Sequence, residues 1–92
     1  MIVLIGANGS MGRRYQASLR YLGQKYVGFD LGEDAQAIRV AKVSDGVILA
    51  SPTDTHYDYY IALHDAEIPI LCEKPLSCDL WKVKHMLFYS GP

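Results

Sequence analysis

The chain opens with Met1-Ile-Val-Leu-Ile-Gly6-Ala-Asn-Gly9-Ser-Met-Gly12-Arg-Arg-Tyr15, and this stretch decides the fold. A continuous run of four apolar residues at 2–5 predicts a buried strand. Three glycines follow it, and apolar residues then recur at helical spacing up to about Leu22. The order is therefore strand, tight turn and helix. Glycine lets the backbone of such a turn adopt conformations closed to other residues, and lets a ligand approach the main chain.

The turn is a candidate phosphate site, because the first turn of a helix has unpaired N–H groups and the positive end of the helix dipole. Its spacing is G-x-x-G-x-x-G, so Asn8 stands where the dinucleotide fingerprint G-x-G-x-x-G has its second glycine. Asparagine tolerates left-handed geometry better than most residues, which makes this departure mild. An ordinary tight turn between a strand and a helix remains the alternative. The residues expected to contact a cofactor here are Gly6, Asn8, Gly9, Ser10, Met11 and Gly12.

Length and composition limit the class of protein. Ninety-two residues, half of them hydrophobic, predict one globular domain spanning residues 1–92. The formal net charge of −1 and the absence of a basic stripe argue against nucleic acid as a partner. The sequence contains no run of about 18 apolar residues, so it predicts no membrane span. It also shows no signal peptide, which favours the cytoplasm. Two cysteines, Cys72 and Cys78, are too few for a disulfide framework, and their spacing predicts no metal site.

Further apolar runs at residues 25–29, 47–50 and 68–72 predict three more strands. Helical segments separate and follow the strands, at about 10–22, 33–40, 53–66 and 77–88. Alternation of this kind implies a parallel sheet with right-handed crossovers. The predicted fold class is α/β: a minimal Rossmann-type open parallel sheet of four strands in the order 2-1-3-4, with flanking helices.

Polar clusters follow each predicted strand, at residues 6–12, at Asp30, at 51–56 and at 73–75. Ligands of open parallel sheets bind outside the carboxyl ends of the strands, so these clusters mark one candidate site. Asp30 lies 24 residues after Gly6, where dinucleotide folds place an acid that hydrogen-bonds the adenosine ribose. Its carboxylate would repel a 2′-phosphate, which favours NAD over NADP. A turn aspartate before Gly32 is the alternative interpretation.

The third and fourth clusters carry a family resemblance. The segments Asp45-Gly-Val-Ile-Leu-Ala-Ser-Pro-Thr-x-x-His56, then Ala62-Leu63, then Ile70-Leu-Cys-Glu-Lys-Pro75 resemble the amino-terminal half of the Gfo/Idh/MocA oxidoreductases. The glutamate-lysine-proline triplet is the specific part of this pattern. The resemblance implies NAD(P) as the cofactor, with contacts from Ser51, Pro52, Thr53, His56, Glu73 and Lys74.

The resemblance also implies that Lys74 is the catalytic residue, near the nicotinamide and the substrate. An ammonium beside a hydroxyl or carbonyl stabilises developing negative charge, and burial lowers the pKa of a lysine toward a useful range. Without the resemblance, Lys74 reads as an exposed lysine before a proline. His56 is expected to fix the third loop rather than carry protons, and Pro75 commonly follows a cis peptide bond in this family.

Three departures from the family pattern shape the functional prediction. Tyr15 stands where the family often has a histidine, and the segment between Asp30 and Asp45 has room only for a short helix. The sequence also stops soon after the last predicted helix, so the family's carboxy-terminal substrate domain is expected to be absent. We therefore predict a dinucleotide-binding module in which hydride transfer needs a second chain to complete the substrate pocket. The sequence does not name the substrate.

Two other functions fit the same residues. One is an interaction or regulatory protein that keeps the fold without the chemistry. The other is a stand-alone reductase whose active site is walled by an oligomer partner, since the glycine loop also resembles that of dihydrodipicolinate reductases.

The third and fourth strands are apolar on both sides, and the first helix leaves one face of them open. This predicts a homodimer through the fourth strand or the last helix, with Trp81 or Phe88 near its centre; alternatively, Trp81 packs on the monomer core.

Overall fold

A computed structural model of the chain describes residues 1–74, 77 and 79–89, with side chains as far as residue 84, so predictions for Pro75, Cys78 and the Phe88 side chain lie outside the described residues. All neighbouring strands pair in parallel in the order β2-β1-β3-β4, which confirms the predicted α/β sheet. The elements are β1 (Ile2–Ile5), α1 (Ser10–Tyr21), β2 (Tyr26–Phe29), α2 (Asp34–Ala41), β3 (Gly46–Leu49), α3 (Thr53–Leu63), the 3-10 turn η1 (His64–Ala66), β4 (Ile70–Cys72) and α4 (Leu80–Tyr89).

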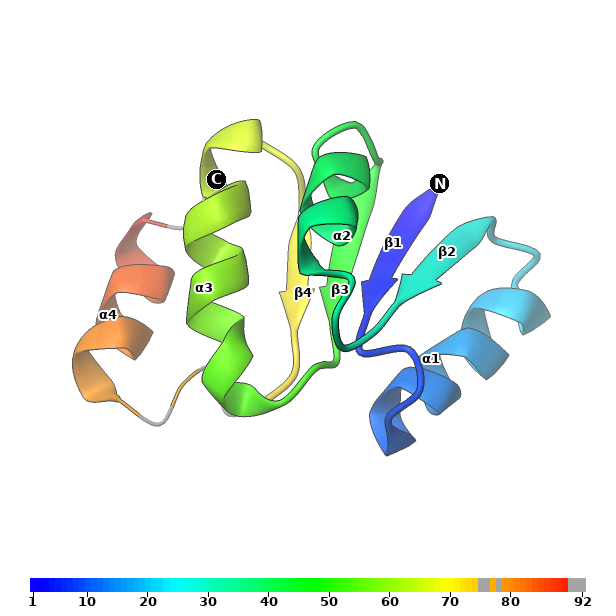
Figure 1. Cartoon of the computed structure of the whole chain (residues 1–92), viewed down its shortest axis with the longest axis horizontal. Helices are drawn as coiled ribbons and strands as arrows, with labels where there is room; N and C mark the ends of the chain where they lie inside the picture. The colour runs from blue at the N-terminus through cyan, green and yellow to red at the C-terminus, as the bar shows by residue number, and fades with distance from the viewer. Residues whose placement is uncertain (75–76, 78, 90–92) are drawn as a thin grey trace.

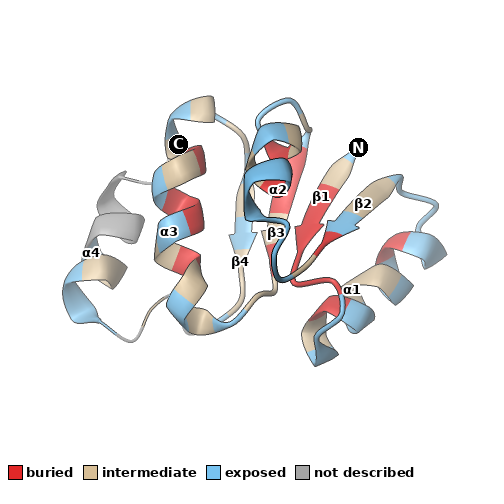
Figure 2. Ribbon diagram, viewed as in Figure 1, coloured by how far each residue is buried: buried red, intermediate tan, exposed pale blue. Residues whose placement is uncertain are grey.

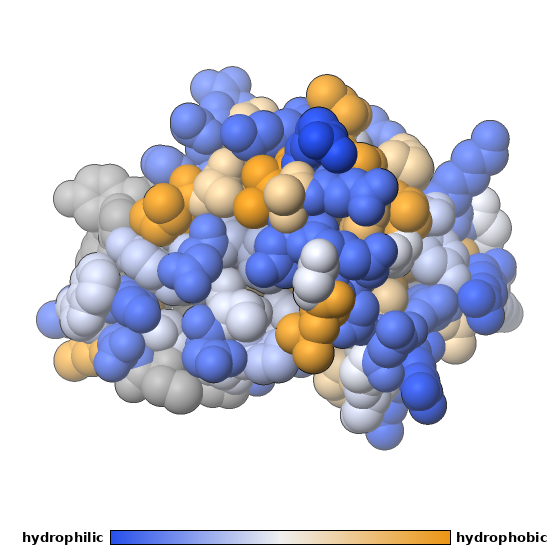
Figure 3. All heavy atoms as spheres, viewed as in Figure 1, coloured by the Kyte–Doolittle hydropathy of each residue, from blue (hydrophilic) through white to orange (hydrophobic). Residues whose placement is uncertain are grey.

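The sheet separates α1 from α2 and α3, which cover its opposite face (Figure 1). The main core lies under α2 and α3, because alternate strand residues point to that side. Val3 and Ile5 of β1 and Val47 and Leu49 of β3 are buried there, together with Leu63 of α3 and other side chains of the two helices (Figure 2). The outer surface over α2 and α3 is largely hydrophilic, with apolar residues gathered in patches (Figure 3).

Among the described elements, α1 alone covers the opposite face of the sheet, and it covers only part of it. One row of the sheet on this face runs from Leu4 in β1 to Ile48 in β3 and Leu71 in β4. Leu4 is fully buried, Ile48 is half-buried and Leu71 is 54% exposed. Burial is therefore lost with distance from α1, and the apolar face of β3 and β4 is open, as the sequence predicts.

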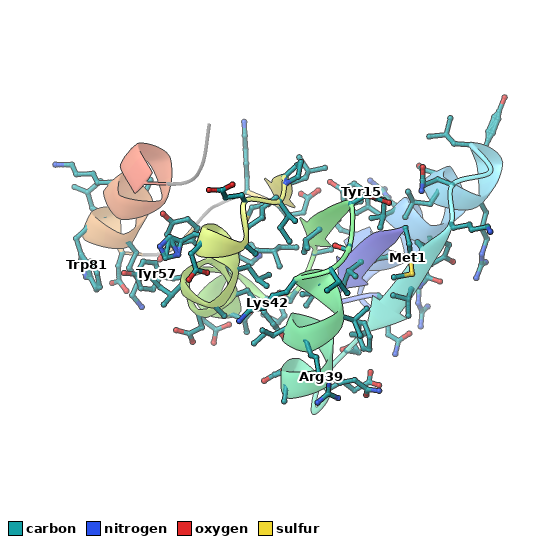
Figure 4. The ribbon with its side chains drawn as sticks, turned by 90° about the horizontal axis from the view of Figure 1, so that it is seen from above. Met1, Tyr15, Arg39, Lys42, Tyr57 and Trp81 are labelled. Atoms are coloured by element: carbon teal, nitrogen blue, oxygen red, sulfur yellow. The ribbon has the colours of Figure 1, made fainter. Side chains whose placement is uncertain are left out.

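The last helix lies against α3 and does not fold back over this open face. The ring of Trp81 meets the ring of Tyr57 edge-on, with centroids 5.3 Å apart (Figure 4). The ammonium of Lys82 lies 5.3 Å from the centre of the Tyr57 ring. These aromatic and cation–π contacts attach α4 to the outer side of α3 and leave Trp81 60% exposed.

Two glycines of the first loop are required by close packing of the backbone. Gly6 has φ of +87°, and a Cβ there would lie 2.4 Å from the Ser51 nitrogen. A Cβ on Gly12 would lie 1.9 Å from the Gly6 carbonyl oxygen, so α1 rests directly on the end of β1. Asn8, by contrast, does not adopt a left-handed conformation. Among the described non-glycine residues, only Glu67 has a positive φ.

Replacing Gly12 with alanine should therefore destabilise the fold strongly, by at least about 2 kcal/mol, because the added methyl group overpacks fixed backbone. Gly9→Ala is the matched control, since a Cβ there meets its nearest neighbour at 3.6 Å. It should cost less than about 1 kcal/mol. Urea unfolding of both variants measures the difference, and equal stability of the two would contradict this packing.

Candidate functional site

The loops that follow the strands meet at one edge of the sheet (Figure 1). The first loop is tied to β2, because the backbone nitrogens of Gly6 and Ala7 both donate to the Phe29 carbonyl oxygen, at 2.9 and 3.2 Å. The strand ends are joined in the same way, since the Ala50 nitrogen donates to the Ile5 carbonyl oxygen at 2.8 Å. The Glu73 nitrogen then donates to the Leu49 carbonyl oxygen at 3.0 Å. The predicted polar clusters are thus held together at the carboxyl edge.

The carboxylate of Asp30 is fixed between two loops. Its Oδ2 accepts the backbone N–H of Asn8 at 2.7 Å, and its Oδ1 accepts the N–H of Leu31 at 2.8 Å. The Asp30 nitrogen in turn donates to Oε1 of Glu33 at 2.8 Å. A carboxylate oxygen can accept about two hydrogen bonds, so each oxygen keeps acceptor capacity for a ligand. Asp30 is therefore oriented beside the glycine loop and available on its outer side.

A cavity of about 60 Å³ opens between the ends of β1, β2 and β3. Its size suits one edge of a ligand rather than a whole nucleotide. Loop residues that the sequence had singled out line it, and so do side chains of α2 and α3 that it had not. The lining residues are Ile5, Gly6, Asp30, Leu31, Asp34, Ser51, Pro52, Thr55 and Tyr59.

The third loop is rigid because its polar groups bond to one another. The Thr55 hydroxyl donates to the Pro52 carbonyl oxygen at 2.6 Å, so the Ser51 hydroxyl is the donor in the 2.7 Å contact between the two side chains. Nε2 of the buried His56 lies 2.8 Å from the Ser51 carbonyl oxygen. The histidine therefore fixes this loop, in the way the sequence led us to expect. Thr53 begins α3 and is half-buried.

At the far end of the edge, Tyr15 of α1 donates its phenol hydrogen to Oε1 of Glu73. This hydrogen bond with Glu73, together with burial, raises the pKa of Tyr15 to about 12. Tyr15 extends from α1 toward the sheet, so the bond ties the helix to the carboxyl end of β4 (Figure 4). Lys74 follows directly and is exposed. The sequence identified Tyr15 only as a departure from a family pattern and gave no sign of this contact.

Sequence reasoning did not identify Asp34 and Tyr59, which line the cavity from α2 and α3. It predicted only the helices in which they lie. The Tyr59 hydroxyl donates to Oδ1 of Asp34 at 2.7 Å, which joins α3 to α2 at the cavity. A signal existed for Tyr59, because it lies four residues after Thr55 and therefore on the same face of the helix. The described residues contain no cluster of three or more potential metal ligands.

Known proteins that resemble this chain in sequence or in fold are oxidoreductases and dehydrogenases. Residues 24–89 match the family model described as "Oxidoreductase family, NAD-binding Rossmann fold" (GFO_IDH_MocA). A 36-residue segment, 39% of this chain and 10% of the relative, is 44% identical to inositol 2-dehydrogenase of Mycolicibacterium gilvum. None of the described helices has the length and apolar character needed to cross a membrane.

Two solved structures share the fold with a TM-score of 0.76 each. One is UDP-N-acetylglucosamine 3-dehydrogenase GnnA from Acidithiobacillus ferrooxidans, 20% identical, where the match covers 94% of this chain and 33% of that one. The other is the dehydrogenase MviM from Clostridium difficile, 19% identical, with 97% and 35% covered. The chain thus spans about a third of the length of these solved relatives.

Replacing Tyr15 with phenylalanine should lower the free energy of unfolding by about 1–2 kcal/mol, because it removes a hydrogen bond to a carboxylate. The raised pKa gives a further signature. The stabilisation is complete below the unfolded-state pKa of about 10 and is lost as the pH rises toward the folded-state value of about 12. The difference in stability between wild type and Tyr15→Phe should therefore shrink between pH 10 and 12.

The matched control is Tyr21→Phe, because the Tyr21 side chain is 82% exposed at the end of the same helix. Urea unfolding at neutral and alkaline pH compares the three proteins. A Tyr15→Phe variant as stable as the control at pH 7 would show that the bond to Glu73 does not hold the edge strand.

Proposed function

The chain belongs to the Gfo/Idh/MocA oxidoreductase family, and from this membership we propose that it is an NAD-preferring dinucleotide-binding module. The proposed module comprises residues 1–92. The residues proposed to contact the cofactor are Gly6, Asn8, Gly9, Ser10, Met11, Gly12, Asp30, Ser51, Pro52, Thr53, His56, Glu73 and Lys74. Support comes from the family model, which describes an NAD-binding Rossmann fold and matches residues 24–89. Further support comes from the loops that carry these residues, which meet at one edge of the sheet (Figure 1).

The placement of Asp30 carries the preference for NAD. Its two oxygens are oriented by the N–H groups of Asn8 and Leu31, and both retain lone pairs on the outer side. Paired ribose hydroxyls suit such an acceptor. A 2′-phosphate would bring a second negative charge within a few ångströms of the carboxylate, at a cost of about 1–4 kcal/mol. The neighbouring carboxylate of Glu33 is also negative and strengthens this exclusion.

The remaining contacts follow from the local structure. The pyrophosphate is placed at the start of α1, where backbone N–H groups have no partner within the helix. Gly6 and Gly12 let the loop lie close enough for this, because any side chain there would collide with backbone. Beside Asp30, the adenine ring is placed over the cavity next to Leu31, whose apolar side chain is 81% exposed.

For catalysis we propose Lys74, which follows Glu73 at the carboxyl end of β4. A bound nicotinamide accepts or donates a hydride. The ammonium of Lys74 would hold the substrate oxygen by a charge-assisted hydrogen bond, and the Tyr15–Glu73 bond positions the backbone from which Lys74 extends. Lys74 is exposed in this chain, so we propose that turnover requires further protein to wall the substrate pocket.

The competing proposal is a non-catalytic interaction or regulatory protein that keeps the fold. The exposure of Lys74 favours it, whereas the glycine loop and Asp30 favour retained cofactor binding. A third proposal is a stand-alone reductase whose active site is completed by a second copy of the same chain. Location in the cytoplasm stays a prediction from the sequence.

We also propose that a second copy of the chain covers the open face of β3 and β4. Among the described strands, β4 pairs only with β3, so β4 lies at the edge of the sheet beside the open face. The same strand carries Leu71, 54% exposed, and the half-buried Ile48 lies beside it. A twofold contact in which the β4 faces of two copies pack on one another would bury both copies of this apolar strip.

Replacing Asp30 with asparagine tests the cofactor preference. The amide keeps an oxygen for the Asn8 N–H but removes the charge. We expect wild type to bind NADH at least tenfold more tightly than NADPH, and the variant to lose about tenfold of that preference. Isothermal titration with NAD, NADH and NADPH measures it. Asp65→Asn is the control, because Asp65 is an exposed acid in η1. Wild type that binds NADPH as tightly as NADH would overturn the assignment of Asp30.

Sedimentation at micromolar concentration tests the dimer. Wild type should sediment at twice the mass of one 10.3 kDa chain, and Leu71→Asp should be a monomer because it places a charge in the contact. Leu22→Asp, at a residue 78% exposed beyond α1, should stay dimeric. Trp81→Ala separates the two predicted contacts, since only a dimer through α4 would dissociate. A wild-type chain that sediments as a monomer would contradict the proposed dimer.

A further inference from the structure

The cavity beside Asp30 contains a second carboxylate that the dinucleotide fingerprint does not use. Asp34 begins α2, four residues after Asp30, and lines the same cavity. The Tyr59 hydroxyl donates to its Oδ1 at 2.7 Å from the neighbouring helix α3. Tyr59 itself is buried in the main core and is only 7% exposed. The buried Tyr59 side chain therefore holds the Asp34 carboxylate in place. Among the described residues, no hydrogen bond to the other oxygen, Oδ2, competes with a ligand.

The side-chain hydroxyls that line the cavity already donate their hydrogen bonds within the protein. The Thr55 hydroxyl donates to the Pro52 carbonyl, the Ser51 hydroxyl to Thr55, and the Tyr59 hydroxyl to Asp34. Burial and the bond to Asp34 raise the pKa of Tyr59, so its phenol stays a donor toward Asp34 at neutral pH. The side chains lining the cavity thus present acceptors, the carboxylates of Asp30 and Asp34, and no unused hydroxyl donor. A ligand group that faces Asp34 must be a donor.

The proposed position of the dinucleotide decides which donor this is. With the ribose at Asp30, the attached base lies over the cavity between the exposed Leu31 and Pro52. A cavity of about 60 Å³ takes one edge of such a planar base. Within NAD, the N–H donor that adenine retains is its exocyclic amino group, because N9 carries the ribose. This group matches the acceptor that Asp34 offers.

Resting on the proposed dinucleotide function, we propose that Asp34 recognises the exocyclic amino group of adenine, and that Tyr59 is its positioning residue. The chain is then selective for the base as well as for the ribose. A dinucleotide with hypoxanthine in place of adenine has a carbonyl oxygen at that position, which would face the carboxylate oxygen and repel it.

Titration of the full chain with NADH and with its hypoxanthine analogue, deamino-NADH, tests the inference. Wild type should bind NADH about tenfold more tightly than deamino-NADH, the loss expected for a hydrogen bond to a charged group. In Asp34→Asn the amide can donate to the carbonyl of hypoxanthine, so the two affinities should agree within about twofold. Tyr59→Phe should reduce the preference in part, and the surface control Asp65→Asn should keep it.

The outcomes separate this inference from the function on which it rests. Wild type that binds NADH but not in preference to deamino-NADH overturns the role of Asp34 and leaves the dinucleotide function standing. An Asp34→Asn variant that changes the ratio of NADPH to NADH, with the base preference intact, also overturns it and assigns Asp34 to the ribose. Failure of wild type to bind any of these dinucleotides refutes both. If Tyr59→Phe does not fold, the Asp34→Asn variant by itself still tests whether Asp34 recognises the amino group of adenine.

Discussion

The close contact of three backbone segments at the carboxyl end of β1 governs the rest of this structure. Gly12 of α1 rests on the carbonyl of Gly6, and Gly6 itself lies against the backbone of Ser51 after β3. Neither contact leaves room for a Cβ. The contacts hold the start of α1, the turn after β1 and the third loop at one point. The geometry of the proposed phosphate site therefore follows from packing, before any ligand is considered.

The charged groups along the sheet edge suit the proposed dinucleotide. Carboxylates of Asp30 and Asp34 lie beside β2, where a hydroxyl-bearing ribose and an amino-bearing base would meet acceptors. The start of α1 lies at the centre, where its dipole favours the anionic pyrophosphate. Lys74 lies beyond β4, at the other end. The order of acceptors, helix start and lysine along the sheet matches the proposed positions of the adenosine, the pyrophosphate and the substrate.

Local patterns were enough to predict the fold. The apolar runs, the glycine spacing and the regular alternation of strands and helices gave the sheet order 2-1-3-4, because short parallel connections leave few other topologies. The positions of Asp30 and of residues 51–56 at the carboxyl edge followed from that topology. The open apolar face beside α1 also followed, from strands that are apolar on both sides.

Contacts between side chains far apart in sequence could not be predicted. The Tyr15–Glu73 bond joins residues 58 positions apart, and Asp34–Tyr59 joins residues 25 apart. Such pairs depend on how two helices are placed relative to one another, which residue periodicity does not specify. The docking of α4 on α3 is similar, because it depends on Tyr57 and Trp81 meeting across separate helices.

The most direct test of the central claim is a map of backbone amide shifts in the ¹⁵N-labelled chain as NADH is added. We expect the shifts to concentrate at the carboxyl edge, in residues 6–12, 30–34 and 51–55. Amides at the opposite edge, such as that of Asp45, should be unaffected, because its nitrogen bonds to the Met1 carbonyl at the amino end of β1. Shifts centred on that amino-terminal edge, or no shifts at saturating NADH, would contradict the proposed site.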